Sequence, residues 1–364
     1  MTQRERQILQ RIEANPMISQ QELADQLGIA RSSVAVHISS LTRQGYLLGK
    51  GYVLRAGTYA AVVGGVNVDI GGRSFQPLVD GDSNPGSITL SLGGVGRNIA
   101  HNLALLGADV RLFTAFGDDV YGQKIAASCA ELGIDASHAL CLPGQATSTY
   151  LYITGPDGEM RVALSDMEIC RQITPRYLAS NLALLQNAQV VVADANLPQE
   201  SLIYLAENCQ SPLFCDPVST AKAGRLLPIL PKIHTLKPNR LEAELLSGVP
   251  IHDRASAVQA ANALLDKGVR RLFLSMGAGG VYAATREEGV WLPNLPGQMV
   301  NTTGCGDAFM AALAWAYLQG TDLVQTARAG LAAAAITMES PQTIHPALSE
   351  TALRLRMGNP YQER

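Results

Sequence analysis

A glycine-rich turn with a carboxylate behind it is the part of this 364-residue chain best suited to chemistry. Gly304, Cys305 and Gly306 form the turn. Asp307 follows, and the apolar run 308–315 after it is typical of a buried helix. Free N–H groups at a helix start attract an anion, and glycines let it approach closely. An anion hole with an adjacent base is what phosphoryl transfer to a hydroxyl requires, although the same string can be a plain capped helix start.

Two further segments carry polar residues at spacings in the sequence that suit ligand binding. Gly93 and Gly94 precede Asn98 in the string Gly-Gly-Val-Gly-Arg-Asn, and such glycines let the backbone lie against a sugar. Asn239 and Glu242 stand three residues apart behind a Lys-Pro pair, so they share one face of a helix start. Without a phosphate motif elsewhere in the chain, this second pair would indicate an ordinary helix cap.

These three segments, in the order 93–98, 237–242 and 301–307 that they have along the chain, resemble the signatures of the ribokinase-like (PfkB-type) carbohydrate and nucleoside kinases. The likeness runs from about residue 59 to 357, and the stretches 82–86, 93–98 and 234–242 are most similar to the pseudouridine kinase branch of that family. The resemblance implies ATP- and Mg²⁺-dependent transfer of phosphate to the 5′-hydroxyl of a nucleoside, with pseudouridine favoured. The alternatives are a kinase for another nucleoside or a sugar, and a transcription regulator that uses the fold to sense a nucleoside.

The acceptor site is expected where an apolar strand, 60–70, runs through two glycines and ends in Asn67 and Asp69. Residues two apart on a strand share a face, and ligands of open α/β sheets sit beyond the carboxyl ends of strands. Both side chains could then bond vicinal ribose hydroxyls, the role that the family resemblance gives Asp69. The alternative is that Asp69 closes a turn.

Short alternating segments within 70–92 and 145–165 correspond in the family to a β lid that excludes water and often forms a dimer contact, so a homodimer is expected. Asp166, just after the second segment, is a candidate contact to the base. Strand and helix patterns then alternate through 190–275, which predicts an α/β fold with a doubly wound, mostly parallel sheet.

A glycine-rich loop at Ser275, Gly277 and Gly280 follows a predicted strand and matches the ATP loop of the family, while no Walker A sequence occurs. Asn301 and Cys305 depart from the family pattern. The aspartate usual at the first position touches a monovalent-cation site, so dependence on K⁺ is open here. Cys305 is expected to contribute its backbone N–H and not its sulfur.

The resemblance and the motifs together assign roles to individual residues. The catalytic set is Asp307 as base with the N–H groups of Gly304, Cys305 and Gly306; the acceptor set is Asn67, Asp69, Gly93, Gly94, Asn98 and Asp166; the ATP set is Asn239, Ser275, Gly277 and Gly280; and Asn239 and Glu242 hold the metal.

Residues 1–56 have a different character from residues 57–364, the predicted kinase domain. Helical spacing of apolar residues and a capping box at Ser19 predict three helices, and the residues around Gly-Lys-Gly at 49–51 predict a hairpin. The pattern looks like an α+β winged helix-turn-helix, and a three-helix interaction or dimerisation module is the alternative. Ser32, Ser33, His37 and Ser40 are expected to face DNA from the third helix. The cations expected near phosphates are Arg31, Arg43 and Lys50.

Composition agrees with two functions on one chain. The net charge is −3, but residues 1–56 hold seven Lys or Arg and four Asp or Glu, so a basic head precedes an acidic body. The six cysteines show no C-x-x-C pair, which argues against a zinc site. No apolar run approaches the roughly 18 residues that span a bilayer, and the start of the chain lacks a signal-peptide core, so a cytoplasmic protein is expected.

Overall fold

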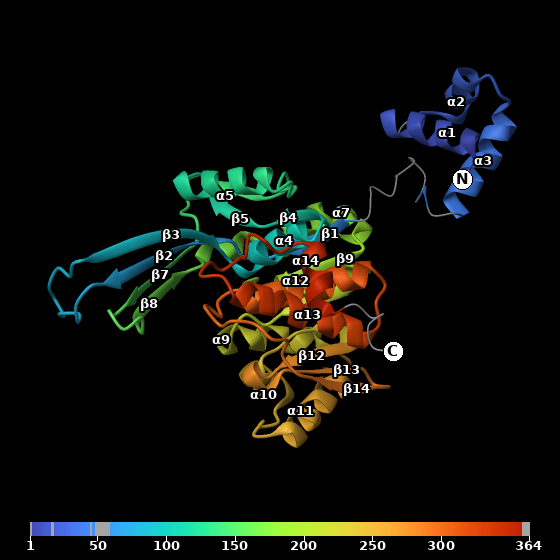
Figure 1. Ribbon diagram of the computed structural model, residues 1–364. Coiled ribbons are helices and arrows are strands. Elements are labelled where there is room, and N and C mark those ends of the chain that lie inside the picture. Colours follow the sequence, from blue (N-terminus) through green and yellow to red (C-terminus); the bar gives the residue numbers. More distant parts are fainter. Residues whose placement is uncertain (1, 16–17, 44–45, 48–58, 359–364) are drawn as a thin grey trace. The chain divides into compact units, whose positions relative to one another are not determined.

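The computed structural model describes residues 2–15, 18–43, 46–47 and 59–358 (Figure 1). The chain divides into two compact units, Met1–Thr58 and Tyr59–Arg364. None of the described helices is long and apolar enough to cross a membrane. The six cysteines all lie within 59–358 and are free thiols.

The described residues of the first unit form a small helical head. The helices are α1 (Gln3–Ala14), α2 (Gln20–Leu27) and α3 (Arg31–Arg43). The predicted capping box is present at α2, where the Ser19 side chain accepts from the N–H of Glu22 and the Glu22 side chain accepts from that of Ser19. The buried residues that hold the head together are Ile8, Ile12, Ile18, Leu23, Ala24, Val34, Ile38, Leu41 and Leu47.

The surface of α3 differs in two ways from the expectation. Val36, one of the apolar residues whose helical spacing predicts this helix, is 68% exposed, since it follows Ser32 by one helical turn and shares its face. The Ser40 hydroxyl donates to the Glu5 carboxylate of α1 at 2.7 Å, so Ser40 ties two helices together. Lys50, the side chain of Arg43 and the predicted wing beyond Leu47 lie outside the described residues.

The second unit is built on an eight-stranded sheet, described within residues 59–358, with the order β14-β13-β12-β11-β10-β9-β1-β4. The six strands from β12 to β4 in that order pair in parallel, and β13 pairs antiparallel with both β12 and β14. The predicted doubly wound, mostly parallel sheet is therefore confirmed. The strands are β1 (Tyr59–Val63), β4 (Asp109–Phe113), β9 (Val190–Asp194), β10 (Leu213–Asp216), β11 (Thr235–Leu236), β12 (Arg271–Ser275), β13 (Val281–Ala284) and β14 (Gly289–Leu292).

Because successive side chains of a strand point to opposite faces of the sheet, each strand contributes residues to two separate hydrophobic layers. In β1, Tyr59, Ala61 and Val63 join one buried cluster, and Ala60 and Val62 join the other. The first layer is covered by α6 (Pro175–Ser180), α7 (Leu182–Asn187), α8 (Gln199–Asn208), α9 (Thr220–Ala223), α10 (Arg240–Ser247) and α11 (Arg254–Asp266). The second is covered by α4 (Val95–Leu105), α5 (Val120–Glu131), α12 (Cys305–Leu318), α13 (Leu323–Met338) and α14 (Glu350–Met357).

A second sheet of four strands, in the order β3-β2-β7-β8, forms the lid and projects from the body of this unit (Figure 1). Its strands match the two predicted lid segments. They are β2 (Asn67–Ser74), β3 (Gly86–Gly93), β7 (Thr149–Thr154) and β8 (Met160–Asp166); a third, two-stranded sheet joins β5 (Ala115–Gly117) and β6 (Leu140–Leu142).

The prediction of one strand over 60–70 is wrong, because the chain changes sheets within it. Strand β1 ends at Val63 and β2 begins at Asn67, so Asn67 and Asp69 lie on the lid and not at the end of a central strand. The crossing occurs at Gly64, where a Cβ atom would overlap the Asp194 carboxylate. A larger residue could not take this path between the two sheets.

Candidate active site

Asp307 lies in the first turn of α12, as the sequence predicts. Gly304 caps this helix in the left-handed region, with φ of 83°, which favours glycine. Asn98 of α4 donates from Nδ2 to Asp307 Oδ2 at 2.8 Å. Asn98, expected at an acceptor hydroxyl, therefore holds the predicted base. Oδ1 of Asp307 is the oxygen that has no hydrogen-bond donor among the described residues.

The surroundings of Asp307 favour its protonated form. Dense protein around the carboxyl is the main cause, although part of the side chain is accessible, and the carboxylates of Asp216 and Asp194 add to it. The hydrogen bond from Asn98 and the charge of Lys237 act in the opposite direction. Together these effects raise the pKa of Asp307 to about 7, which suits a general base at neutral pH.

The backbone donors in front of α12 differ in availability. The N–H of Cys305 points to Thr302 O at 3.3 Å, whereas no described residue accepts from the N–H of Gly304 or Gly306. The free donors are thus those of the two glycines, and Cys305 would have to give up a weak contact to join them. Burial raises the pKa of the Cys305 thiol to about 11, and its Sγ lies 3.5 Å from Ala334 O.

Asp69 and Asn67 stand together at the root of the lid. Asn67 Nδ2 donates to Asp69 Oδ1 at 2.6 Å, and burial raises the pKa of Asp69. Gly93 pairs with Asn67 on the neighbouring strand, and a Cβ atom at Gly93 would overlap the Asp69 carboxylate. Gly94 follows as the N-cap of α4. The predicted glycine pair therefore leaves room for a carboxylate of the protein itself, and α4 carries Asn98 from here to Asp307.

Asp166 lies on the other face of the lid. The register pairs Thr149 with Asp166 and Tyr150 with Ser165, and it pairs Asp69 with Tyr150. Because side chains alternate, Tyr150 and Ser165 share the face of Asp69, and Asp166 does not. The predicted contact of Asp166 with the nucleobase of the acceptor is not compatible with this register. Asp166 Oδ1 instead accepts from the N–H of Glu168.

The predicted ATP residues come together at the ends of β11 and β12. Asn239 and Ser275 form a parallel bridge, and the N–H of Ser275 donates to Pro238 O at 3.0 Å. Gly277 begins a short 3₁₀ turn (Gly277–Gly279) that follows Ser275 after one residue, and Gly280 caps the end of this turn. Asn239 and Ser275 are 36 positions apart in the sequence. The bridge between them places the segment of Asn239 next to the glycine-rich loop.

Asn239 and Glu242 form a complete helix cap at the start of α10. Asn239 Oδ1 accepts from the N–H of Glu242 at 3.0 Å, and Glu242 Oε2 accepts from that of Asn239 at 2.9 Å. Glu242 Oε1 has no hydrogen bond among the described residues. Mg²⁺ keeps several waters and needs one or two carboxylates, so this buried carboxylate fits such an ion while the cap persists.

Three charged residues of the site were not assigned roles from the sequence. Asp194 ends β9, Asp216 ends β10 and Lys237 directly follows β11, and Lys237 Nζ lies 3.1 Å from Asp216 Oδ2. Burial raises the pKa of Asp194 to about 6. Burial acts against the charge of Lys237, but Asp216 and Glu242 outweigh it and raise the pKa of that lysine. The rule that sites form at the carboxyl ends of parallel strands could have identified all three.

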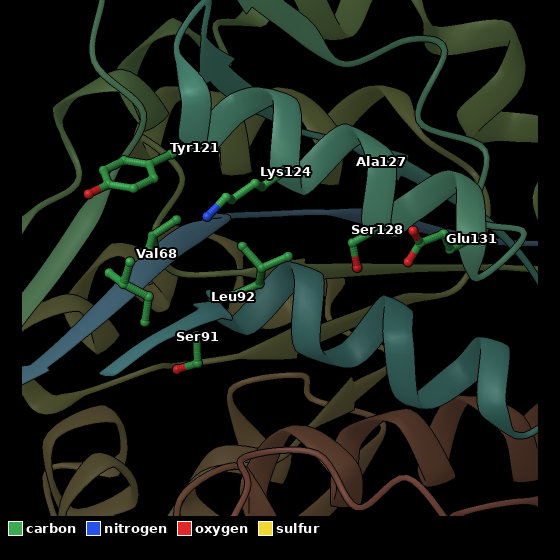
Figure 2. A pocket seen from close by; sticks show the side chains of 9 residues that line it. Val68, Ser91, Leu92, Tyr121, Lys124, Ala127, Ser128 and Glu131 are labelled. Atoms are coloured by element: carbon green, nitrogen blue, oxygen red, sulfur yellow. The ribbon is translucent and has the colours of Figure 1, made fainter. Parts of the chain in front are cut away.

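A cavity of about 360 Å³ lies elsewhere, between α5 and the root of β2 and β3 (Figure 2). Val68 and Leu92 face Tyr121 and Lys124 across it. None of Asp69, Asn98 and Asp307 lines this cavity, so it is not the acceptor site. The remaining lining residues are Leu90, Ser91, Ala127, Ser128 and Glu131.

Comparisons with known proteins agree with this geometry. Residues 58–351 match the pfkB family carbohydrate kinases, and residues 1–47 match the family described as winged helix-turn-helix DNA-binding. The chain belongs to the pfkB family of carbohydrate kinases. It is accordingly an ATP-dependent phosphotransferase that acts on a hydroxyl group, preceded by a winged helix-turn-helix head.

Three relatives illustrate the match. The uncharacterized sugar kinase YeiI of Escherichia coli (strain K12) is 41% identical over 98% of this chain and 99% of its own length. The pseudouridine kinase of the same strain is 40% identical over 81% of this chain and 95% of its own. A solved carbohydrate kinase from Agrobacterium tumefaciens is 31% identical, with a TM-score of 0.73 over 83% of this chain and 97% of that one.

Catalysis should fail on mild acidification. Asp307 accepts a proton only when ionised, and its raised pKa means that this form is lost as the pH falls through about 7 instead of the ordinary 3.8. We expect kcat/KM, measured from about pH 5 to 9, to show an acid limb with an apparent pKa near 7. A rate that stays constant down to about pH 5 would remove Asp307 from this role.

Proposed function

We propose that this protein phosphorylates the 5′-hydroxyl of a nucleoside with ATP and that pseudouridine is its acceptor. The observation that carries the proposal is the Asn98–Asp307 hydrogen bond beside the free glycine N–H groups of α12. It combines an oriented base, whose pKa is raised to about 7, with donors for an anion. The choice of pseudouridine is supported by the 40% identity to the E. coli pseudouridine kinase.

The face of the lid that carries Asp69 supports a nucleoside over a free sugar. Tyr150 and Tyr152 share this face, and their ring centroids are 5.9 Å apart. Aromatic rings there offer a flat apolar surface to a nucleobase, which a sugar alone would not need. Asp69 and Asn67 at the root of the same face can bond ribose hydroxyls.

In this reaction a bond forms between the acceptor oxygen and the γ-phosphorus, and the bond from that phosphorus to the bridging oxygen of ADP breaks. The hydroxyl proton passes to Asp307 Oδ1, since Asn98 occupies Oδ2. The N–H groups of Gly304 and Gly306 stabilise charge on the transferring group. Asn239 and Glu242 would hold Mg²⁺, which neutralises phosphate charge when bound.

The role of K⁺ is a separate part of the proposal. Asn301, at the position of the usual aspartate, donates from Nδ2 to Pro341 O at 3.2 Å and accepts from the N–H of Thr303 at 3.0 Å. It adds no negative charge for a cation. We therefore favour an enzyme that does not depend on K⁺.

An acceptor screen tests the proposed reaction. With ATP and Mg²⁺, we expect phosphate transfer to pseudouridine to exceed transfer to inosine, uridine, ribose and fructose, measured by ADP release and product mass. Asp307→Asn removes the base and should lower kcat by about 10²–10⁴ with little change in nucleoside affinity. Preference for a sugar would select the sugar-kinase alternative, and inactivity with every acceptor would favour a sensor.

The head supports a second function, DNA binding, for the same chain. Residues 1–47 match winged helix-turn-helix DNA-binding proteins, and Arg31, Ser32 and Ser33 are exposed at the start of α3, where recognition helices contact bases. His37 is partly exposed one turn further along. We propose that the protein binds DNA near its own gene and that the nucleoside alters this binding.

A gel shift with the DNA upstream of the gene tests this role. Ser33→Glu places a negative charge on the exposed face of α3 and should abolish the shift by repelling phosphates. Gln10→Glu adds the same charge on the exposed face of α1 and should leave the shift intact. If the unaltered protein gives no shift even at low salt, the head has an interaction or dimerisation role instead.

The outer face of the lid supports a homodimer. Ile88 is 76% exposed, Leu90 52%, Val162 48% and Leu164 66%, and the register places all four on the face opposite Asp69. A contiguous apolar sheet face of this kind is typical of an interaction surface. We propose that it packs against the same face of a second copy.

Light scattering after gel filtration decides the oligomeric state. Ile88→Lys should convert the dimer to a monomer, since it would bury a charge within an apolar contact. Ser87→Lys, the neighbouring residue on the opposite face, should leave the dimer intact. A monomeric unaltered protein, or a dimer that withstands Ile88→Lys, would contradict the lid contact.

A further inference from the structure

Lys237 is a buried cation that the reaction as described above does not use. It is 6% exposed overall, and the buried acids around the ends of the strands are Asp194, Asp216 and Glu242. Arg97 is the other buried cation of the described kinase unit, but its guanidinium donates to Leu92 O and Ser128 Oγ, towards the lid and α5. Two further cations lie at the end of β9, but both are turned to the loop after it: Lys222 Nζ donates to Asn196 Oδ1, and Arg225 donates to the carbonyl oxygens of residues 195–197. Lys237 is the cation whose ammonium lies next to Gly306.

The ammonium of Lys237 lies directly beside the anion hole. A Cβ atom at Gly306 would stand 3.2 Å from Lys237 Nζ, so glycine at this position leaves the ammonium uncovered on that side. At the start of α12, the N–H groups of Gly304 and Gly306 have no acceptor among the described residues. A phosphoryl oxygen bound to the N–H of Gly306 would therefore lie within reach of the charge of Lys237.

Asp216 is held in place by its own turn. Its Oδ1 accepts from the N–H of Val218 at 2.8 Å, and its Oδ2 lies 3.1 Å from Lys237 Nζ. Val218 has a φ of 68°, and the N–H of Ser219 donates to Pro217 O at 2.7 Å across it, as in the rarer and more strained type of γ-turn. Such strain in a β-branched residue persists where the surroundings impose it, commonly at functional sites.

The contact with Asp216 does not saturate the ammonium. Asp216 Oδ2 has no well-directed hydrogen-bond donor among the described residues, so the contact is an ion pair at close range. An ammonium carries three N–H donors, and among the described residues only Asp216 lies within ion-pair distance of Lys237, while Glu242 and Asp307 interact with its charge from further away. Donors therefore remain on the ammonium for a ligand at Gly306.

The balance of charge argues in the same direction. The carboxylates of Asp194, Asp216, Glu242 and Asp307 surround the place where a highly negative triphosphate must enter. A buried ion pair is seldom retained for stability alone, because an apolar pair of similar size does as well or better. Lys237 has the charge and the location to offset the repulsion between these carboxylates and the phosphates.

We propose that Lys237 is a phosphate-binding residue of the anion hole, that its ammonium contacts the transferring phosphoryl group beside Gly306, and that Asp216 is the positioning residue that holds it there. This inference rests on the kinase reaction and not on the identity of the acceptor. It adds a fixed side-chain charge to the backbone donors already described.

The test compares how tightly variants bind AMP-PNP, a non-hydrolysable ATP analogue, and AMP, which lacks the β- and γ-phosphates. In calorimetry, Lys237→Met should weaken AMP-PNP about tenfold or more and leave AMP nearly unchanged, and it should lower kcat by about 10²–10³ with little change in the KM of the acceptor. Lys237→Arg, which keeps the charge, should recover part of both losses. Asp216→Asn should give an intermediate loss.

Lys267→Met is the matched control. Lys267 Nζ donates to Leu246 O and Ser247 O, so this lysine has a structural role far along the chain from the strand ends and should leave the AMP-PNP to AMP ratio unchanged. A folded Lys237→Met protein with the AMP-PNP affinity of the unaltered protein would overturn the inference. If Lys237→Met does not fold, unchanged AMP-PNP affinity in Asp216→Asn would overturn it. Absence of transfer to every acceptor would reject the proposed reaction, and the binding comparison would still decide the role of Lys237.

Discussion

The structure depends on one electrostatic constraint, the burial of several carboxylates at the carboxyl edge of a parallel sheet. Strands β9 and β10 both end in aspartate, and because neighbouring parallel strands end at the same edge, Asp194 and Asp216 meet there with Asp307 close by. Burial is the largest cause that raises the pKa of Asp194 and of Asp307; the charge of Asp216 adds to it for both, and the charge of Asp194 adds to it for Asp307. A carboxyl that would be a weak base in water thereby becomes a base suited to neutral pH.

The helices that complete the site are fixed by apolar packing. Helix α12 presents Asp307 in its first turn, and further along it buries Phe309, Met310, Leu313 and Trp315 in one of the two hydrophobic layers. Burial of such side chains stabilises the fold by roughly 1.5–3 kcal/mol each. The proposed base is therefore carried by a well-packed helix of the unit, and the hydrogen bond from α4, which packs against α12, sets its orientation.

The two faces of the lid strands differ, which suits the lid to the two purposes proposed for it. The face with Asp69, Tyr150 and Ser165 is polar and aromatic, and the opposite face is apolar and exposed at Ile88 and Leu164. A sheet that projects from the body in this way can cover a ligand on one side and contact another molecule on the other. One of its connections to the body is the crossing at Gly64, where the chain leaves the central sheet beside Asp194.

The sequence by itself determined the features that depend on neighbouring residues. The glycine-flanked start of α12, the capping boxes at Ser19 and Asn239, and the strands that end at Asp216 and Ser275 follow from local spacing, capping and apolar periodicity. The order of the motifs was also sufficient to indicate the family. Local patterns of this kind act over a few residues and survive in any fold that contains them.

Only the tertiary structure decided which distant groups meet. Asn98 and Asp307 are 209 positions apart, and Lys237 reaches Gly306 through the packing of α12 over the sheet, which no local spacing encodes. The face of Asp166 was decided by strand register, where a shift of one residue reverses the direction of every side chain. The pKa of Asp307 likewise belongs to the assembled site, because it is set by burial and by charges that only the folded chain brings together.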